Sequence, residues 1–245
     1  MANLLDEMTG PVNDNGRDVR VIERQLPVQV GKESTIFEIA LWITIPILVL
    51  LYACINGSSL TEIFIGCLLG VLPGVIFIFM KISALNYFQQ LEQRIQAEAS
   101  NIDTHIEQRV QILQNVAGLL GKAIEVDKDV MKSVAALRSG IVNETNRSDI
   151  NKQVNTAFNS LLPHIEAYPN LESHKAIADA MQQNNLLQRE ITAARTVYNS
   201  RVTQWNTDIY SWPTKMIVAA KQGYTTRIPF SVSAETREKA RSQFF

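Results

Sequence analysis

The side chains that could carry out catalysis or bind a metal ion are few and widely separated. The three histidines are His105, His164 and His174, and none of them lies in an H-E-x-x-H motif. The chain also lacks a cysteine pair with metal-ligand spacing and a glycine-rich phosphate loop. We therefore expect no metal, no cofactor and no small-molecule substrate, and we predict that the protein is not an enzyme.

Cation binding and nucleic-acid binding are disfavoured as well. Glu125, Asp127 and Asp129 gather near a predicted helix bend, but side chains two residues apart on a helix point in different directions. Residues 81–245 carry 19 basic and 16 acidic residues without a basic stripe. We expect no nucleic-acid partner, because such a partner requires a concentrated basic surface.

Two long apolar runs, residues 36–55 and 63–80, determine where any side chain of this protein can act. A helix of about 20 apolar residues crosses the hydrocarbon core of a bilayer. The intervening Asn-Gly-Ser-Ser at 56–59 is a turn that suits water rather than lipid. We predict a transmembrane hairpin, and the alternative is a buried hairpin in a large soluble core. Cys54 and Cys67, which lie in the runs, are interpreted as small apolar packing residues.

The second apolar run carries a glycine at every fourth position, namely Gly66, Gly70 and Gly74. Small residues at this spacing form a smooth stripe along which another helix can approach closely. The partner of this stripe is either the first run or a second copy of the chain. Pro46 and Pro73 lie inside the two runs and predict a kink in each helix.

Basic residues near the ends of the runs predict the orientation of the hairpin. The polar N-terminal arm, residues 1–35, and the segment that begins at Lys81 contain Lys and Arg, whereas the turn contains neither. Lys and Arg are concentrated in cytoplasmic loops. Both termini are therefore expected in the cytoplasm, in a multi-pass topology.

The remainder of the chain is predicted to be all-α. Residues 81–138 form an amphipathic helix that continues the second run, a short helix is capped by Ser148 or Asp149 and ends near Pro163, and a second long helix covers residues 171–211. The apolar face of the first long helix, its seam, is expected at Leu85, Phe88, Leu91, Ile95, Ala99, Ile102, Ile106, Val110, Leu113, Ala117, Leu120 and Ile124. The second is expected at Ile177, Met181, Leu187, Ile191, Ala194, Tyr198, Val202, Trp205, Ile209 and Trp212.

These helices predict the domain organisation. We expect the transmembrane hairpin (36–81) to continue into a long antiparallel, coiled-coil-like helical bundle over residues 82–230. Within it, residues 224–230 are expected to be extended. Residues 231–245 form a basic tail that either rests on anionic headgroups or is solvated.

Two arginines fall on or beside the predicted apolar seams, Arg109 on the first long helix and Arg195 on the second. A buried arginine needs a polar partner. The candidates for that partner are Asp103, Asn115, Asn199 or a backbone carbonyl. We interpret the arginines as polar clamps that fix the register of the helices rather than as catalytic groups.

Several short sequence motifs occur in a characteristic order along residues 86–230. The first elements are Asn86-Tyr87, Ile102-Asp103 and a run from Arg109 to Val116, which includes Asn115. Glu125 and Arg138 follow this run. The later ones are Tyr168-Pro169-Asn170-Leu171, a run from Ile191 that includes Arg195, Tyr198 and Asn199, then Asn206 and Trp212-Pro213. In these elements the chain resembles the bacterial LemA family.

The resemblance implies a membrane-anchored helical bundle on the cytoplasmic side of the bacterial inner membrane. The family has no established enzymatic activity, and some members are linked to the biogenesis of membrane compartments such as magnetosomes. This chain departs from the family in having a hairpin where typical members have one N-terminal span. It also has Gln188-Arg189 where the family usually has Glu-Asn.

The leading functional hypothesis is a homo-oligomeric membrane scaffold. In this hypothesis the glycine stripe and the long helices join copies of the chain, which shape or organise the membrane with lipid as their partner. The alternative is an adaptor or regulator whose bundle docks a second membrane protein, such as a protease or a sensor kinase.

Overall fold

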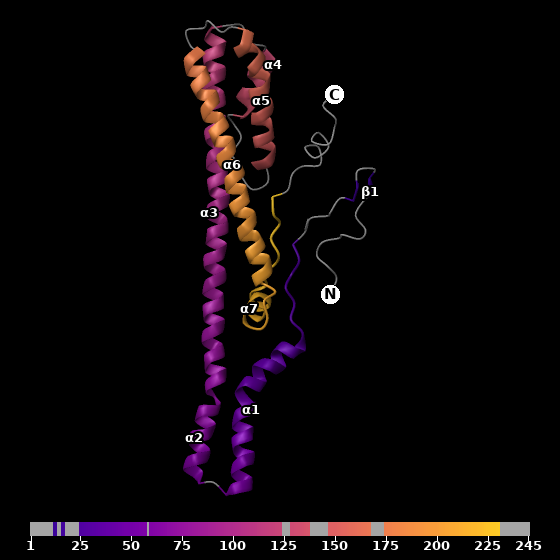
Figure 1. Cartoon of the computed structure of the whole chain (residues 1–245), viewed down its shortest axis with the longest axis vertical. Coiled ribbons are helices and arrows are strands. Elements are labelled where there is room, and N and C mark those ends of the chain that lie inside the picture. The colour runs from indigo at the N-terminus through magenta and orange to yellow at the C-terminus, as the bar shows by residue number, and fades with distance from the viewer. Residues whose placement is uncertain are drawn as a thin grey trace. The chain divides into compact units, whose positions relative to one another are not determined.

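The computed structural model of the chain describes residues 12–13, 16–17, 25–57, 59–123, 128–137, 147–167 and 174–230. Within these residues the fold is mainly helical (Figure 1). The non-helical parts include the two-residue antiparallel strands β1 (Val12–Asn13) and β2 (Gly16–Arg17), and the extended residues 25–30 and 224–230, which are joined by a bridge between Pro27 and Thr225. The predictions for the Glu125–Asp127 acids, for Tyr168, Pro169 and Leu171, and for the basic tail lie outside the described residues.

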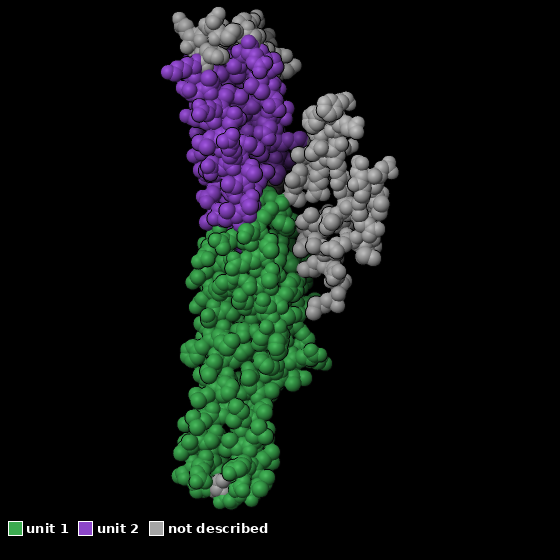
Figure 2. Space-filling model, viewed as in Figure 1, with its two compact units in different colours: residues 1–94, 199–245 green, residues 95–198 purple. Residues whose placement is uncertain are grey.

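The described chain forms two compact units, which are coloured separately in Figure 2. Unit 1 contains residues 1–94 and 199–245, and unit 2 contains residues 95–198. The predicted bundle, residues 82–230, therefore contributes to both units, because the long helices α3 (Leu72–Ala123) and α6 (His174–Asp208) each have residues in both.

The two apolar runs form paired helices in unit 1. Helix α1 (Lys32–Asn56) ends at Gly57, whose φ of 64° allows its N–H to bond the carbonyl of Ala53. Helix α2 (Leu60–Gly70) begins with a capping box in which Ser59 and Glu62 bond each other's backbone N–H groups. The polar turn between the runs is thus a helix stop followed by a helix start, and α1 packs on α2.

The two prolines affect their helices differently. Pro46 lies inside α1, which is visibly bent in Figure 1. Near Pro73 the second run is divided, because α2 ends at Gly70 and α3 begins at Leu72. Pro73 has no N–H to bond the carbonyl of Leu69, and that carbonyl accepts from Val71 instead.

Helix α3 runs without a break past Lys81, as predicted, so the end of the second apolar run and the start of the bundle belong to one helix. The prediction that this helix reaches residue 138 was wrong. Helix α3 ends at Ala123, and a separate helix, α4 (Lys128–Leu137), packs on α5 through a face that includes Val134 and Leu137.

The later helices differ from the predicted ones mainly at their ends. Helix α5 (Arg147–Ala167) buries Ile150, Val154, Phe158 and Leu161 as predicted, but it starts before Ser148 and continues through Pro163. Pro163 thus lies inside α5, whose buried face packs in the bundle on both sides of the proline, at Leu161 and Ile165. Helix α6 ends at Asp208, before the predicted end at Ser211, and α7 (Thr214–Gln222) follows it, whereas the predicted start at residue 171 lies outside the described residues.

Most buried positions of α3 from Phe88 onward follow a seven-residue spacing. One set of positions is Phe88, Ile95, Ile102, Arg109 and Val116, and the other is Ala99, Ile106, Leu113 and Leu120, all of them buried. Val110, predicted on this seam, is only half-buried, and the neighbouring Arg109 takes the core position. A polar residue at such a position fixes helix register because it must find its partners.

Candidate functional site

Unit 2 holds the most buried charge of the described chain, Arg109, which is 1% exposed. Its Nε donates to Asn184 on α6 at 2.9 Å, and its Nη1 donates to Asn151 on α5 at 2.6 Å and to Gln188 on α6. Its Nη2 donates to Asn155 on α5 at 2.7 Å. One guanidinium thus joins three helices through four amide oxygens.

The electrostatics of this network are unusual, because these partners of Arg109 are all uncharged. Burial, followed by the positive charge of Arg195, lowers the pKa of Arg109 from its ordinary value to about 10. Burial and the charge of Arg147 also lower the pKa of Arg195. Four of the five N–H groups of Arg109 thus donate to amide oxygens, which supply hydrogen bonds but no negative charge.

A second arginine, Arg147 at the start of α5, pairs with the carboxylate of Asp103 on α3. Its Nη2 lies 2.6 Å from Asp103 Oδ2, and the arginine side chain is 6% exposed. A bidentate arginine–carboxylate pair fixes orientation as well as distance. The three side chains predicted as partners for Arg109 or Arg195 are not among the four side chains to which Arg109 donates, because Asp103 pairs with Arg147, Asn115 is exposed and Asn199 bonds the backbone of Phe230.

The amide partners of Arg109 do not follow from an apolar pattern, because they are polar residues at buried or half-buried positions of α5 and α6. On α6 the buried residues Ile177, Asn184 and Ile191 lie seven residues apart. Asn184 therefore belongs to the buried seam, whereas Leu187, which was predicted there, is half-buried. The same spacing, continued from Val202, reaches Arg195 and Gln188. A strict heptad count that admits polar residues would have found these positions.

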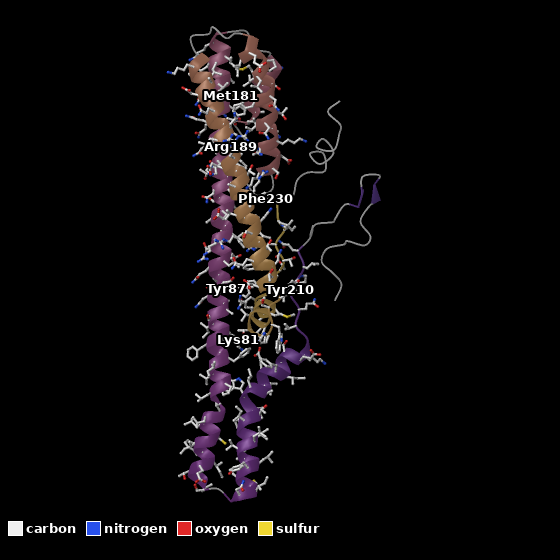
Figure 3. All side chains as sticks on the ribbon, viewed as in Figure 1. Lys81, Tyr87, Met181, Arg189, Tyr210 and Phe230 are labelled. Atoms are coloured by element: carbon white, nitrogen blue, oxygen red, sulfur yellow. The ribbon has the colours of Figure 1, made fainter. Side chains whose placement is uncertain are left out.

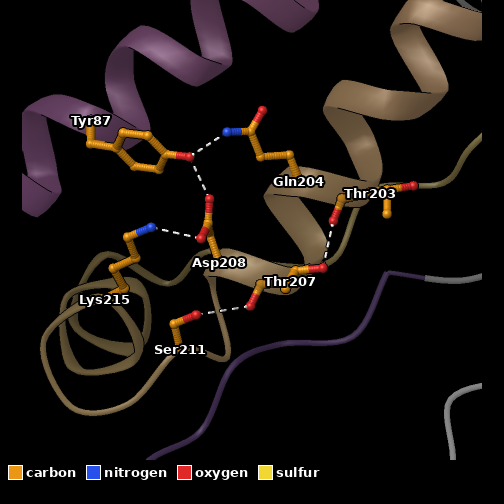
Figure 4. Close-up of polar contacts among 7 residues, drawn as sticks. All are labelled: Tyr87, Thr203, Gln204, Thr207, Asp208, Ser211 and Lys215. Carbon is orange, nitrogen blue, oxygen red and sulfur yellow. Dashed lines mark hydrogen bonds and ion pairs between the residues drawn. The ribbon is translucent and has the colours of Figure 1, made fainter.

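In unit 1, Tyr87 on α3 lies at the centre of a polar cluster with the end of α6 (Figure 4). Its hydroxyl donates to Asp208 and accepts from Gln204 Nε2 at 2.7 Å. Lys215 Nζ lies 2.6 Å from Asp208 and 4.3 Å from the centre of the Tyr87 ring. Burial, together with the hydrogen bond to Asp208 and its charge, raises the pKa of Tyr87.

Two asparagines of α6 hold the extended segment that follows α7. Asn206 bonds both the N–H and the carbonyl of Arg227, at 2.8 and 2.9 Å, and Asn199 bonds both backbone groups of Phe230, at 2.8 and 3.0 Å. Trp205, between them, donates to the carbonyl of Thr225 at 2.9 Å. Backbone hydrogen bonds add to these contacts, because Thr226 N–H donates to the carbonyl of Leu26 and Val28 N–H donates to the carbonyl of Tyr224. Side chains of α6 and residues 26–28 together satisfy the backbone of the extended segment.

The glycine stripe of the second run faces α1 of the same chain. A Cβ added at Gly66 would lie 2.7 Å from Val49, one at Gly70 would lie 3.0 Å from Pro46, and one at Gly74 would lie 2.5 Å from the Trp42 ring. Of the two partners considered, the stripe is therefore covered by the first run. It provides the close approach of the hairpin helices.

An ion-pair cluster closes the same hairpin at its base. Lys81, labelled in Figure 3, lies 3.1 Å from Glu38 on α1, and Lys221 of α7 lies 2.7 and 2.9 Å from the two oxygens of that carboxylate. One acid thus joins both apolar runs to α7.

The other predicted site residues have more modest environments. Asn86 and Asn115 are exposed, and Tyr198 is half-buried and makes contacts of its own. Cys54 and Cys67 are free thiols. Trp212, predicted on the second seam, is 59% exposed.

Comparison with known proteins gives one match. The family model described as the LemA family matches residues 98–244. No curated protein and no solved structure matches the chain.

Proposed function

This chain belongs to the LemA family, and we propose that it is a non-enzymatic membrane scaffold, with the α1–α2 hairpin in the bilayer and the helical bundle on the cytoplasmic side of the bacterial inner membrane. Lys32–Asn56 and the helical stretch from Leu60 are long and apolar enough to cross a membrane. In the most apolar 18-residue stretch of each helix, only 6% and 17% of the residues, respectively, are buried. Side chains such as Ile55, 82% exposed, and Phe64, 70% exposed, suit lipid better than water.

The observation that carries the proposal is the continuity of α3. The helix begins inside the second apolar run and continues past Lys81 into the bundle. A continuous helix transmits position and orientation, whereas a flexible linker does not. In this proposal the bundle is therefore held at a defined angle to the membrane, as a scaffold requires.

The topology is tested by cysteine labelling in intact spheroplasts. In a Cys54→Ser, Cys67→Ser background, Ser59→Cys in the turn and Gln222→Cys at the end of α7 are exposed to a membrane-impermeant maleimide. We expect Ser59→Cys to react in intact spheroplasts and Gln222→Cys to react only after permeabilisation. Labelling of both, or recovery of the protein in the soluble fraction, would contradict the proposal.

Self-association is proposed through the bundle, since α1 occupies the glycine stripe. Leu186 and Val197 on α6 are 56% and 40% exposed, and their spacing of about three helical turns places them on one face. A photo-crosslinking residue at position 186 should give mainly self-adducts in native membranes, unlike one at the exposed position 185. One dominant foreign adduct would favour the alternative, an adaptor that docks another membrane protein.

A further inference from the structure

Trp212 is the most exposed tryptophan of the chain, with 59% of its surface accessible. It belongs to the turn between α6 and α7, far along the chain from the apolar runs. Its ring nevertheless lies 5.0 Å, centre to centre, from the ring of Phe37 on α1. Phe37 in turn lies 5.7 Å from Phe77 on α3. The indole thus extends an aromatic contact between the two apolar runs.

Trp212 lies at the end of the hairpin where the apolar runs give way to charged residues. Phe37 is followed directly by Glu38, the acid that bonds Lys81 and Lys221. Lys81 is the first charged residue after the second apolar run. The apolar surface of both runs therefore ends next to Trp212, and Lys221, with a side chain 55% exposed, lies at the same end.

We propose that Trp212 is a membrane-interface anchor, whose indole lies between the lipid headgroups and the acyl chains and holds the α6–α7 turn against the bilayer. This inference rests on the proposed insertion of the hairpin. Tryptophan is enriched at this boundary because its ring is apolar and its N–H is polar. The exposed indole contacts Phe37 at the end of the first apolar run, and the exposed Lys221 side chain suits anionic headgroups.

The anchor is tested by tryptophan fluorescence of the full chain in phosphatidylcholine–phosphatidylglycerol vesicles. The lipids carry bromine atoms, which quench nearby indoles, either close to the headgroup or near the ends of the acyl chains. The chain has three tryptophans, and Trp205 is only 2% exposed. Trp42→Phe isolates Trp212, Trp212→Phe isolates Trp42, and the double variant gives the Trp205 background.

We expect shallow bromines to cause loss of Trp212 emission and deep bromines to have little effect. Trp42 lies five residues further into α1 than Phe37, about 7 Å along the helix, and should be quenched from a greater depth. Quenching of Trp212 by aqueous iodide but by neither lipid would overturn the anchor, and so would protection from all three quenchers, which would indicate a protein partner. Absence of lipid quenching of Trp42 would instead contradict the insertion of the hairpin.

Discussion

Arg109 on α3 and Asn184 on α6 are both buried and are joined by a hydrogen bond of 2.9 Å from Nε to Oδ1. Each occupies a position of a seven-residue series that is otherwise apolar. Sliding either helix by one turn would leave a buried cation without its acceptors. The pair therefore specifies the register of two helices whose apolar contacts alone would tolerate more than one alignment.

Loss of the guanidinium should destabilise unit 2. Arg109→Met removes the donors while the buried amides of Asn184 and Asn151 remain, and an unpaired buried polar group costs about 1–3 kcal/mol. We expect the thermal midpoint, followed by circular dichroism in detergent, to fall clearly. Arg189→Ala, at an exposed position of α6, should change stability by less than about 0.5 kcal/mol. Equal midpoints for the two variants would contradict the clamp.

A carboxylate in place of one amide should stabilise the same network. Gln188 Oε1 already accepts from Arg109 Nη1, so Gln188→Glu keeps the geometry and adds the missing negative charge. The existing bond already has a charged donor, so the gain is the attraction between the two charges less the cost of desolvating the carboxylate, and we expect about 1 kcal/mol in unfolding free energy at this half-buried position. The exposed Gln182→Glu, which adds the same charge, should give no such gain. A lower midpoint for Gln188→Glu would show that Arg109 does not need a counter-charge.

The arginine cluster also shows what the sequence could and could not predict. Periodicity located both long helices, the hairpin and the seam on α3, because burial of apolar side chains imposes that period. The apolar pattern predicted Val110 and Leu187 as buried seam residues, because only apolar residues were admitted. In the structure these two are half-buried, and the polar Arg109 and Asn184 are buried instead. The partners of Arg109 lie 42 to 79 residues away on two other helices, and no local pattern encodes such distances.

The Tyr87 cluster predicts a stability difference that depends on pH. Tyr87→Phe removes hydrogen bonds to Asp208 and Gln204 and should cost about 1–2 kcal/mol at neutral pH. The folded-state pKa of Tyr87 lies above its ordinary value of 10.0, so this contribution is fully present below pH 10 and is lost as the pH rises through the raised pKa.

Thermal midpoints of the wild type and Tyr87→Phe should therefore converge above pH 10. Lys215, which faces both Tyr87 and Asp208, is retained in both proteins. Tyr52→Phe, in the exposed surface of α1, should follow the wild type at every pH. A constant gap between wild type and Tyr87→Phe across this range would contradict the assignment.

The asparagine contacts on α6 should control access to the extended segment. Asn206→Ala removes both backbone hydrogen bonds of Arg227, whose peptide bond to Ile228 is a trypsin site. A loss of about 1–2 kcal/mol corresponds to a roughly 5- to 30-fold larger open population, and cleavage at Arg227 should accelerate by a similar factor. Asn185→Ala, at an exposed position of α6, should leave the cleavage rate unchanged. Equal rates would mean that other contacts hold the segment.

The same substitution should have opposite effects at two glycines of the chain. At Gly74 an added Cβ would lie 2.5 Å from the Trp42 ring, so Gly74→Ala must displace that ring and separate α1 from the second run. Overpacking of this kind costs about 1–3 kcal/mol. At Gly118, inside α3, an added Cβ meets nothing within 4 Å, and Gly118→Ala should stabilise the helix by about 1 kcal/mol.

Thermal midpoints in detergent should therefore fall for Gly74→Ala and rise for Gly118→Ala, and only Gly74→Ala should shift the emission of Trp42. Self-association through the glycine stripe predicts a different result, in which Gly74→Ala lowers the oligomeric state and leaves Trp42 emission unchanged. The structure favours the first result, because the stripe is already covered by α1 of the same chain. Any assembly of copies then has to use another surface, either the outer faces of the hairpin helices or the bundle.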